Sequence, residues 1–294
     1  MTLIDLITAQ SARLKQAGVS FGHGTTNAFD ESAWLVLWSL GMSLDALEAH
    51  AKRELSLEEQ AEAEALVTKR IDTRQPAAYL THEAWLQNVP FYVDERVIVP
   101  RSFIAELLVD AEGEGTLDAW LSDTTHQVLD LCTGNGSLAI IAAMAYPDVT
   151  VDAADVSEDA LAVARINVDR HKLAQRIALL QSDLLAAVHG PYDLILCNPP
   201  YVNSQSMQAL PPEYQAEPAL ALAGGADGMD LVRTILREAP KHLTNDAVLV
   251  LEIGNERAHF EHAFRRLEVA WLETSAGANQ VLLVTRESLA RYRW

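Results

Sequence analysis

The residues with the clearest chemical potential form the tetrapeptide Asn198-Pro199-Pro200-Tyr201. The apolar run before it, 194–197, predicts a buried strand, and the two prolines forbid its continuation. Asn198 is therefore expected at the carboxyl end of a strand, where open α/β sheets place their binding crevices. Its side-chain oxygen and the Pro199 carbonyl would offer two acceptors to a planar NH2 group, whose π-face Tyr201 could cover. The motif predicts a site for an amide or amino nitrogen.

A glycine-rich turn follows another apolar run further upstream. Residues 128–139 read VLDLCTGNGSLA, which predicts a strand, a turn and the start of a helix. Gly134 and Gly136 allow a tight turn and a close approach of the backbone to a ligand. Taken alone, this pattern fits a dinucleotide fingerprint, so a nicotinamide dehydrogenase explains it equally well.

Two acidic residues follow the next two predicted strands. The strand 150–155 ends in Asp155, at the position from which a carboxylate holds ribose hydroxyls in nucleotide sites. Asp183 follows a third apolar strand and could accept a hydrogen bond from an adenine amino group. The glycine turn, the two acids and the Asn-Pro-Pro-Tyr motif thus follow four successive strands, and a dehydrogenase has no need of the last motif.

Together these motifs resemble class I S-adenosylmethionine-dependent methyltransferases, and specifically the protein-(glutamine-N(5)) methyltransferase family, which modifies translation proteins on a Gly-Gly-Gln-type glutamine. The resemblance extends from about Gln75 to the C-terminus, and it includes QPAAYL at 75–80 and VPR at 99–101, which the wider class lacks. It implies an α/β, Rossmann-like fold with a seven-stranded, mostly parallel sheet and a small N-terminal helical domain.

Three further features are similar to one branch of that family, which modifies large-subunit ribosomal protein L(3). They are the stretch FYVDERVIVPRS at 91–102, the Ala84-Trp85 pair and the Cys132 form of the glycine motif. The resemblance therefore implies methylation of the side-chain amide nitrogen of a specific glutamine in that protein. The same chemistry on peptide chain release factors stays an alternative.

The resemblance also implies residue roles, with S-adenosylmethionine as cofactor and S-adenosylhomocysteine as product. No metal is expected because no spacing of Cys and His resembles a metal site, and no catalytic histidine is expected because transfer needs no general base beforehand. The glutamine amide would bind at Asn198, Pro199, Pro200 and Tyr201. The cofactor would bind at Asp130, Cys132, Thr133, Gly134, Asn135, Gly136, Asp155, Asp183, Leu184 and Asn198. Leu184 departs from the family, which often has an aromatic residue beside the adenine.

The charge of the chain narrows the class of partner. The sequence contains 22 Lys and Arg against 41 Asp and Glu, a net charge of −19. Nucleic-acid enzymes need a basic track, so this balance disfavours an adenine-specific nucleic-acid methyltransferase, which shares the Asn-Pro-Pro-Tyr motif. A basic ribosomal protein, free or in an assembling large subunit, is a complementary partner. General acidity of soluble bacterial proteins explains the charge equally well.

The same residues disfavour two other classes of protein. A nucleotide-sensing protein that binds the cofactor without turnover would have no need to keep Asn198–Tyr201. A secreted or membrane protein is not expected, because the segment Met1–Asp5 carries an early acid and no apolar run approaches about 20 residues. The sequence thus predicts a cytoplasmic enzyme with no membrane contact and no direct nucleic-acid substrate.

The chain divides into three predicted parts. Residues 1–75 have helical periodicity, which predicts a small helical domain with Trp34, Leu35 and Trp38 in its core. The resemblance implies that this domain recognises the protein substrate, so a recognition surface formed by these three residues is the alternative. Residues 76–100 form a linker with a β-hairpin of strands 84–86 and 91–93. Residues 101–294 alternate strands and helices and form the catalytic domain.

The sequence also predicts the environment of a long segment after the Asn-Pro-Pro-Tyr motif, of the two cysteines and of four histidines. The long segment 202–227 is expected to close over the substrate, with Glu217 either part of this lid or a solvated acid. Cys132 and Cys197 are expected to be small buried thiols that lie close together without a disulfide. Four histidines are expected at the surface: His23, His126, His171 and His262.

Overall fold

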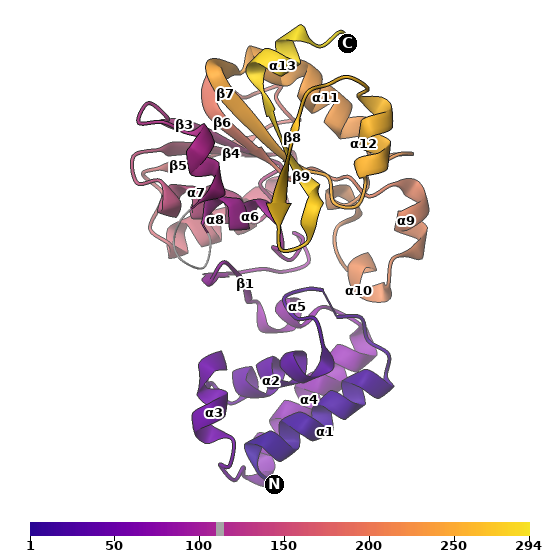
Figure 1. Ribbon diagram of the computed structural model, residues 1–294. Helices are drawn as coiled ribbons and strands as arrows, with labels where there is room; N and C mark the ends of the chain where they lie inside the picture. Colours follow the sequence, from indigo (N-terminus) through magenta and orange to yellow (C-terminus); the bar gives the residue numbers. More distant parts are fainter. Residues whose placement is uncertain (110–114) are drawn as a thin grey trace.

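The computed structural model describes residues 1–109 and 115–294. Figure 1 shows a helical N-terminal part below an α/β part, with a short hairpin at their junction. The α-helices are α1 (Leu3–Gln16), α2 (Ala28–Ser39), α3 (Leu47–His50), α4 (Leu57–Thr73), α5 (Ala77–Thr81), α6 (Ile104–Leu108), α7 (Ser137–Ala145), α8 (Glu158–Arg170), α9 (Ser204–Ala209), α10 (Pro212–Gln215), α11 (Asp230–Glu238), α12 (Arg257–Ala263) and α13 (Arg286–Arg291). The 3-10 helices are η1 (Leu44–Ala46), η2 (Thr116–Trp120), η3 (Ala219–Ala221) and η4 (Ala239–Lys241). The strands are β1 (Ala84–Leu86), β2 (Val89–Phe91), β3 (Gln127–Leu131), β4 (Thr150–Asp155), β5 (Ile177–Gln181), β6 (Tyr192–Cys197), β7 (Leu243–Glu252), β8 (Ala270–Thr274) and β9 (Gly277–Thr285).

The N-terminal part is built on α1, α2 and α4. Capping boxes begin α1 at Thr2 and α4 at Ser56, because each hydroxyl accepts from a backbone N–H three residues on, whose acidic side chain bonds back. Trp34 and Leu35 are buried, as predicted, but Trp38 is 41% exposed, so its predicted place in the core is wrong. The buried stripe that packs on α1 runs through Val36 instead of Trp38.

A buried arginine links this helical part to the α/β part. Arg70 on α4 donates to Glu31 on α2 at 2.9 Å and to Glu213 on α10 at 3.2 Å, and a third bond reaches the Ser20 carbonyl at 3.0 Å. The Arg70 side chain is about 1% exposed. Among the described residues, Arg70 is the one ion-pair partner of Glu31, whereas Glu213 also accepts from Arg74 Nε at 2.6 Å. Glu31 therefore depends on this guanidinium, since an unpaired buried charge is costly.

Replacement of Arg70 by alanine is therefore expected to lower the free energy of unfolding by about 3–5 kcal/mol, because it leaves the buried Glu31 without its ion-pair partner and leaves Glu213 with Arg74 alone. Arg53→Ala is the matched control, since Arg53 pairs with Glu59 at the surface and should cost less than about 1 kcal/mol. Urea unfolding of both variants checks this. Equal losses would show that the buried network adds nothing beyond a surface pair.

The hairpin has a different register from the predicted one. Leu86 pairs with Val89, so the turn contains only Gln87 and Asn88, with φ of 47° and 60°. Positive φ at both turn residues is typical of a tight two-residue hairpin whose twist matches its strands. The second strand is therefore Val89–Phe91, and the predicted strand at 91–93 is wrong by two residues.

The α/β part has one seven-stranded sheet in the order β5-β4-β3-β6-β7-β9-β8. The first five strands in this order are parallel, and β9 runs antiparallel to both β7 and β8. Buried side chains of α6 and α7 cover one face, and those of α11 and α12 cover the other. The predicted Rossmann-like fold is confirmed. The strand order reverses between β3 and β6, which is where such sheets bind ligands.

Membrane insertion through a helix has no support in the structure. Within the part of the chain that the structure describes, none of the helices combines the length and the apolar character that a bilayer crossing requires.

Candidate active site

A cavity of about 260 Å³ opens at the carboxyl ends of β3, β4 and β6. Residues that follow these strands meet there with the end of the linker and with the segment after β6. The walls that matter for chemistry contain Arg101, Cys132, Thr133, Gly134, Asn135, Asp155, Asp183, Leu184, Asn198 and Pro200. The predicted site residues Asp130, Gly136, Pro199 and Tyr201 lie outside these walls.

Asp130 shapes the glycine turn from behind the cavity. Its Oδ2 accepts from Thr133 Oγ1 at 2.5 Å and from the Ala139 backbone N–H at 3.0 Å, which ties the turn to α7. Burial raises the pKa of Asp130 to about 7. At Gly136, φ is 82°, and a Cβ would lie 3.3 Å from the Ala164 side chain. Both residues therefore position the turn, and any ligand would contact the turn itself.

Asp155 presents a carboxylate to the cavity at the end of β4. Its Oδ2 accepts from the Gly134 N–H and its Oδ1 from the Ser157 N–H, each at 2.9 Å. Burial raises the pKa of Asp155, and these backbone donors oppose that shift. A carboxylate has about four acceptor sites, so capacity for ligand hydroxyls remains.

Asp183 and Leu184 form the cavity wall beyond β5. Asp183 is exposed, and Leu184 is half-buried with φ of 48°. Ser182 Oγ donates to the Leu184 carbonyl at 2.6 Å, which holds this unusual backbone in place. The wall therefore combines a free carboxylate with an apolar side chain.

Asn198 lies at the end of β6 and faces the same cavity, together with Pro200. It is half-buried, and within residues 1–109 and 115–294 no protein group forms a hydrogen bond with its side-chain amide. The strands β3 and β6 are neighbours, with Leu131 opposite Cys197. The glycine turn and Asn198 are therefore adjacent, as their strand ends predict.

Comparisons with known proteins decide the family. Residues 109–211 match the family described as methyltransferase small domain, and residues 5–81 match the PrmC N-terminal domain. The ribosomal protein uL3 glutamine methyltransferase of Bordetella pertussis is 53% identical over 98% of this chain and 96% of that protein. The proteins of the same name from Burkholderia pseudomallei and Neisseria meningitidis are 51% and 49% identical, again over 98% of this chain and over 95% and 94% of theirs. The chain belongs to the uL3 glutamine methyltransferase family.

Solved structures support the fold of this methyltransferase. The hMettl16 catalytic domain in complex with MAT2A 3'UTR hairpin 6 matches with a TM-score of 0.51 and 14% identity, over 78% of this chain and 85% of that chain. The complex with hairpin 1 also has a TM-score of 0.51, with 15% identity over 81% and 83% of the two chains. At this identity the likeness concerns the fold alone. The predicted family and methyltransferase fold are confirmed.

Tyr201 occupies a different place from the one its motif suggests. Its hydroxyl donates to Glu252 Oε1 at 3.3 Å, and a Cβ on Gly254 would lie only 2.5 Å from its ring. Glu252 Oε2 accepts from Ser102 Oγ at 2.6 Å and from the Phe103 N–H at 2.9 Å. Burial raises the pKa of Glu252 to about 6. In this uL3-family chain Glu252 thus connects the Asn-Pro-Pro-Tyr motif with the first residues of the catalytic domain, just after the linker.

Glu217 joins the segment after β6 to both domains. Its carboxylate accepts from Arg101 Nη1 at 2.6 Å, from Arg101 Nη2 at 2.7 Å and from the Val99 N–H at 2.9 Å. His23 Nε2 lies 3.5 Å from it, and the His23 ring contacts Tyr214 with 4.3 Å between centroids. Glu217 is therefore no solvated acid, and the predicted surface position of His23 is wrong because the ring is buried.

Low pH should weaken the ion pair between Glu217 and Arg101. Burial alone would raise the pKa of Glu217, but His23 and Arg101 outweigh it and lower the pKa to about 2. Because the pKa of Glu217 is lower in the folded protein, its carboxylate stabilises the fold fully at pH values above the unfolded-state pKa of about 4.5. That stabilisation is lost as the pH falls toward 2. We expect the wild type to exceed Glu217→Gln in unfolding free energy by about 3 kcal/mol at pH 7, and by less at pH 4. Urea unfolding at both pH values checks this, and a difference that does not change with pH would contradict it.

The remaining predictions on cysteines and histidines have mixed outcomes. Cys132 and Cys197 are free and adjacent; burial and the Cys132 thiol raise the pKa of Cys197. Cys132 is only half-buried, because it borders the cavity. His126 and His262 are exposed as predicted, whereas His171 is half-buried, 2.8 Å from a backbone carbonyl of the hairpin.

No motif in the sequence indicates Glu252 or the partners of Glu217. Glu252 ends the apolar strand β7, and an acid after such a run is the only local signal it has. Tyr201 lies 51 positions from Glu252 along the chain, and Ser102 lies 150 positions from it. Val99 and Arg101 lie 118 and 116 positions from Glu217. Only the folded structure brings these groups together.

Proposed function

We propose that this enzyme methylates the side-chain amide nitrogen of a glutamine in ribosomal protein uL3, with S-adenosylmethionine as the methyl donor. The observation that carries the proposal is the Asn198 amide, which has no hydrogen-bond partner among the described residues and shares one cavity with the glycine turn and Asp155. The names of relatives that are 49–53% identical over 98% of the chain support uL3 as the substrate.

The residues in the cavity fit the donor molecule. A Cβ on Gly134 would meet no atom within 4 Å, so the backbone there faces open space that a ligand can enter. Asp155 would accept from ribose hydroxyls and Asp183 from an adenine amino group, beside the apolar Leu184. When bound, S-adenosylmethionine supplies a methyl group on a positively charged sulfur.

The protein's own task is to hold and activate a weak nucleophile, since the lone pair of an amide nitrogen is delocalised into its carbonyl. Asn198 Oδ1 would accept one N–H group of the glutamine from the cavity wall and direct its nitrogen toward the methyl group. The Pro199 carbonyl, which lies outside that wall, would accept the second N–H group once the main chain turns it toward the cavity. As the nitrogen gains positive charge, these acceptors bind it more tightly, which favours the transition state over the ground state. Orientation adds to this, because well-aligned groups reach effective molarities of about 10⁵ M or more.

The three parts of the chain would divide the work. Residues 1–75 would recognise the protein substrate, residues 76–100 link the domains, and residues 101–294 catalyse. Pro218 and Leu220, which follow Glu217, border the cavity, which supports closure of the segment 202–227 over the glutamine. The enzyme would act in the cytoplasm, on free uL3 or on an assembling large subunit.

Methyl transfer to purified substrates tests the proposal. The enzyme, labelled S-adenosylmethionine and one recipient are combined, where the recipient is uL3, a peptide chain release factor or ribosomal RNA. We expect label on a glutamine of uL3, far above the other two. Label on the release factor alone would keep the chemistry and refute the substrate, and label on RNA alone would refute both.

A further inference from the structure

A second hollow, of about 320 Å³, lies in the N-terminal part, and among the described residues none borders both cavities. It is formed by α2, the segment of η1 and α3, and β1 of the hairpin. We call it the apolar groove. Its main lining side chains are Phe29, Trp34, Leu37, Leu44, Leu47 and Trp85.

Three of these side chains are unusually exposed. Phe29 is 39%, Leu44 45% and Trp85 43% exposed, although other apolar residues nearby are buried. Large apolar side chains gathered on one exposed patch are typical of protein interaction sites. Because Trp85 belongs to the hairpin and the others to the helices, the groove spans the recognition domain and the linker.

The surroundings of the apolar groove are acidic. Between Gly24 and His50 the sequence contains no Lys or Arg. Asp30 borders the groove, and Asp45 and Glu48 are exposed beside Leu44 and Leu47. Glu83 accepts from the Trp85 indole N–H at 2.8 Å. An apolar centre with a negative rim complements an apolar side chain flanked by Lys or Arg.

We propose that the apolar groove binds a basic segment of uL3 that is distinct from the methylated glutamine, through one aliphatic or aromatic side chain of that segment. This inference rests on the proposed function. A second copy of a chain with net charge −19, a nucleic acid or an anionic membrane would each meet like charge at the rim, so the charges favour a basic protein. Two contacts on one substrate would raise its affinity above that of the glutamine site alone.

Two truncations test the apolar contact, each with a control of the same residue type; Trp120 is 42% exposed, close to Trp85, and Leu57 is 84% exposed, more than Leu44. Trp85→Ala and Leu44→Ala are compared with Trp120→Ala and Leu57→Ala, which remove exposed apolar side chains outside the groove. We expect the KM for intact uL3 to rise about 10-fold in the groove variants, as for central interface residues. Their kcat, and their kcat/KM for a short peptide that carries only the glutamine and its neighbours, should stay at the wild-type value.

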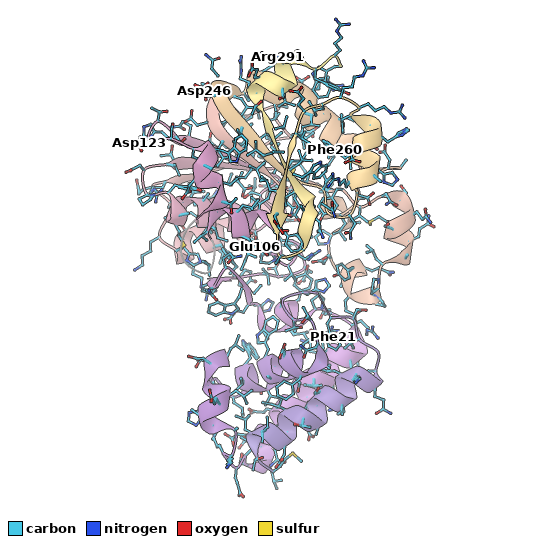
Figure 2. The ribbon with its side chains drawn as sticks, in the orientation of Figure 1. Phe21, Glu106, Asp123, Asp246, Phe260 and Arg291 are labelled. Atoms are coloured by element: carbon cyan, nitrogen blue, oxygen red, sulfur yellow. The ribbon has the colours of Figure 1, made fainter. Side chains whose placement is uncertain are left out.

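A second pair of variants tests the acidic rim by neutralising its charges. Asp45→Asn with Glu48→Gln should raise the KM for uL3 and weaken its salt dependence, because two rim charges are gone. Asp123→Asn with Asp246→Asn is the control, since both acids lie on the α/β part far from the N-terminal helices (Figure 2). An unchanged KM for uL3 in all groove variants would overturn the inference while wild-type methylation of uL3 still upheld the proposed function. Loss of a wild-type dimer in the groove variants, at constant KM, would assign the groove to a second copy instead.

Discussion

Replacement of Asn198 by alanine is expected to lower kcat for glutamine methylation by about 10²–10³-fold, the usual cost of losing one preorganised polar group at the reacting centre. The side chain faces the cavity without a protein partner, so its removal leaves no buried group unsatisfied. The affinity for S-adenosylmethionine should therefore change by less than about 3-fold, which is under 1 kcal/mol. Steady-state kinetics and calorimetric titration measure the two quantities separately.

Asn198→Asp is the matched comparison, because aspartate keeps an acceptor oxygen of the same reach. We expect it to retain more activity than Asn198→Ala. Normal turnover by Asn198→Ala would refute the two-acceptor clamp. A parallel loss of cofactor affinity would mean that Asn198 holds the cofactor and not the glutamine.

Replacement of Asp155 by alanine should weaken S-adenosylmethionine binding by about 10–100-fold, which corresponds to a charged hydrogen bond of roughly 1.5–3 kcal/mol. The change also removes the acceptor of the Gly134 and Ser157 backbone donors, so the glycine turn loses its tie to β4. Calorimetric titration with the cofactor measures the effect.

Asp183→Ala is the control for that change, because Asp183 is exposed beside the next strand and holds no turn in place. Its effect on cofactor affinity should be smaller. Equal losses of cofactor affinity in the two variants would contradict a larger contribution from Asp155 than from Asp183. Unchanged affinity in Asp155→Ala would show that Asp155 does not bind the cofactor.

The sheet and its strand ends were predictable because each motif follows a short, mostly apolar run that is typical of a buried strand. Residues 128–131, 150–155 and 194–197 each carry this signal, and parallel strands bring their carboxyl ends to one edge. The neighbourhood of Asn198 and the glycine turn follows from those positions. The sequence alone could not distinguish cavity walls from supports, so Asp130 was grouped with the residues whose turn it holds.

Residues whose partners are distant in sequence escaped prediction. His23 lies in a polar stretch of sequence, which predicts a surface position, but contacts with Glu217 and Tyr214 bury its ring. Glu252 became visible only when β7 placed it beside Ser102 and Tyr201. The prediction for Trp38 was wrong for a local reason, because the buried stripe of α2 runs through Val36 and leaves Trp38 at the surface.

The central claim is most directly tested by labelling in cells that lack this protein. Their lysate is incubated with the purified enzyme and labelled S-adenosylmethionine, and the labelled band is mapped by mass spectrometry, with Asn198→Ala as the inactive control. The account predicts a single methyl group on a glutamine side chain of uL3. Label on release factors or only on nucleic acid, with no label on uL3, would contradict it.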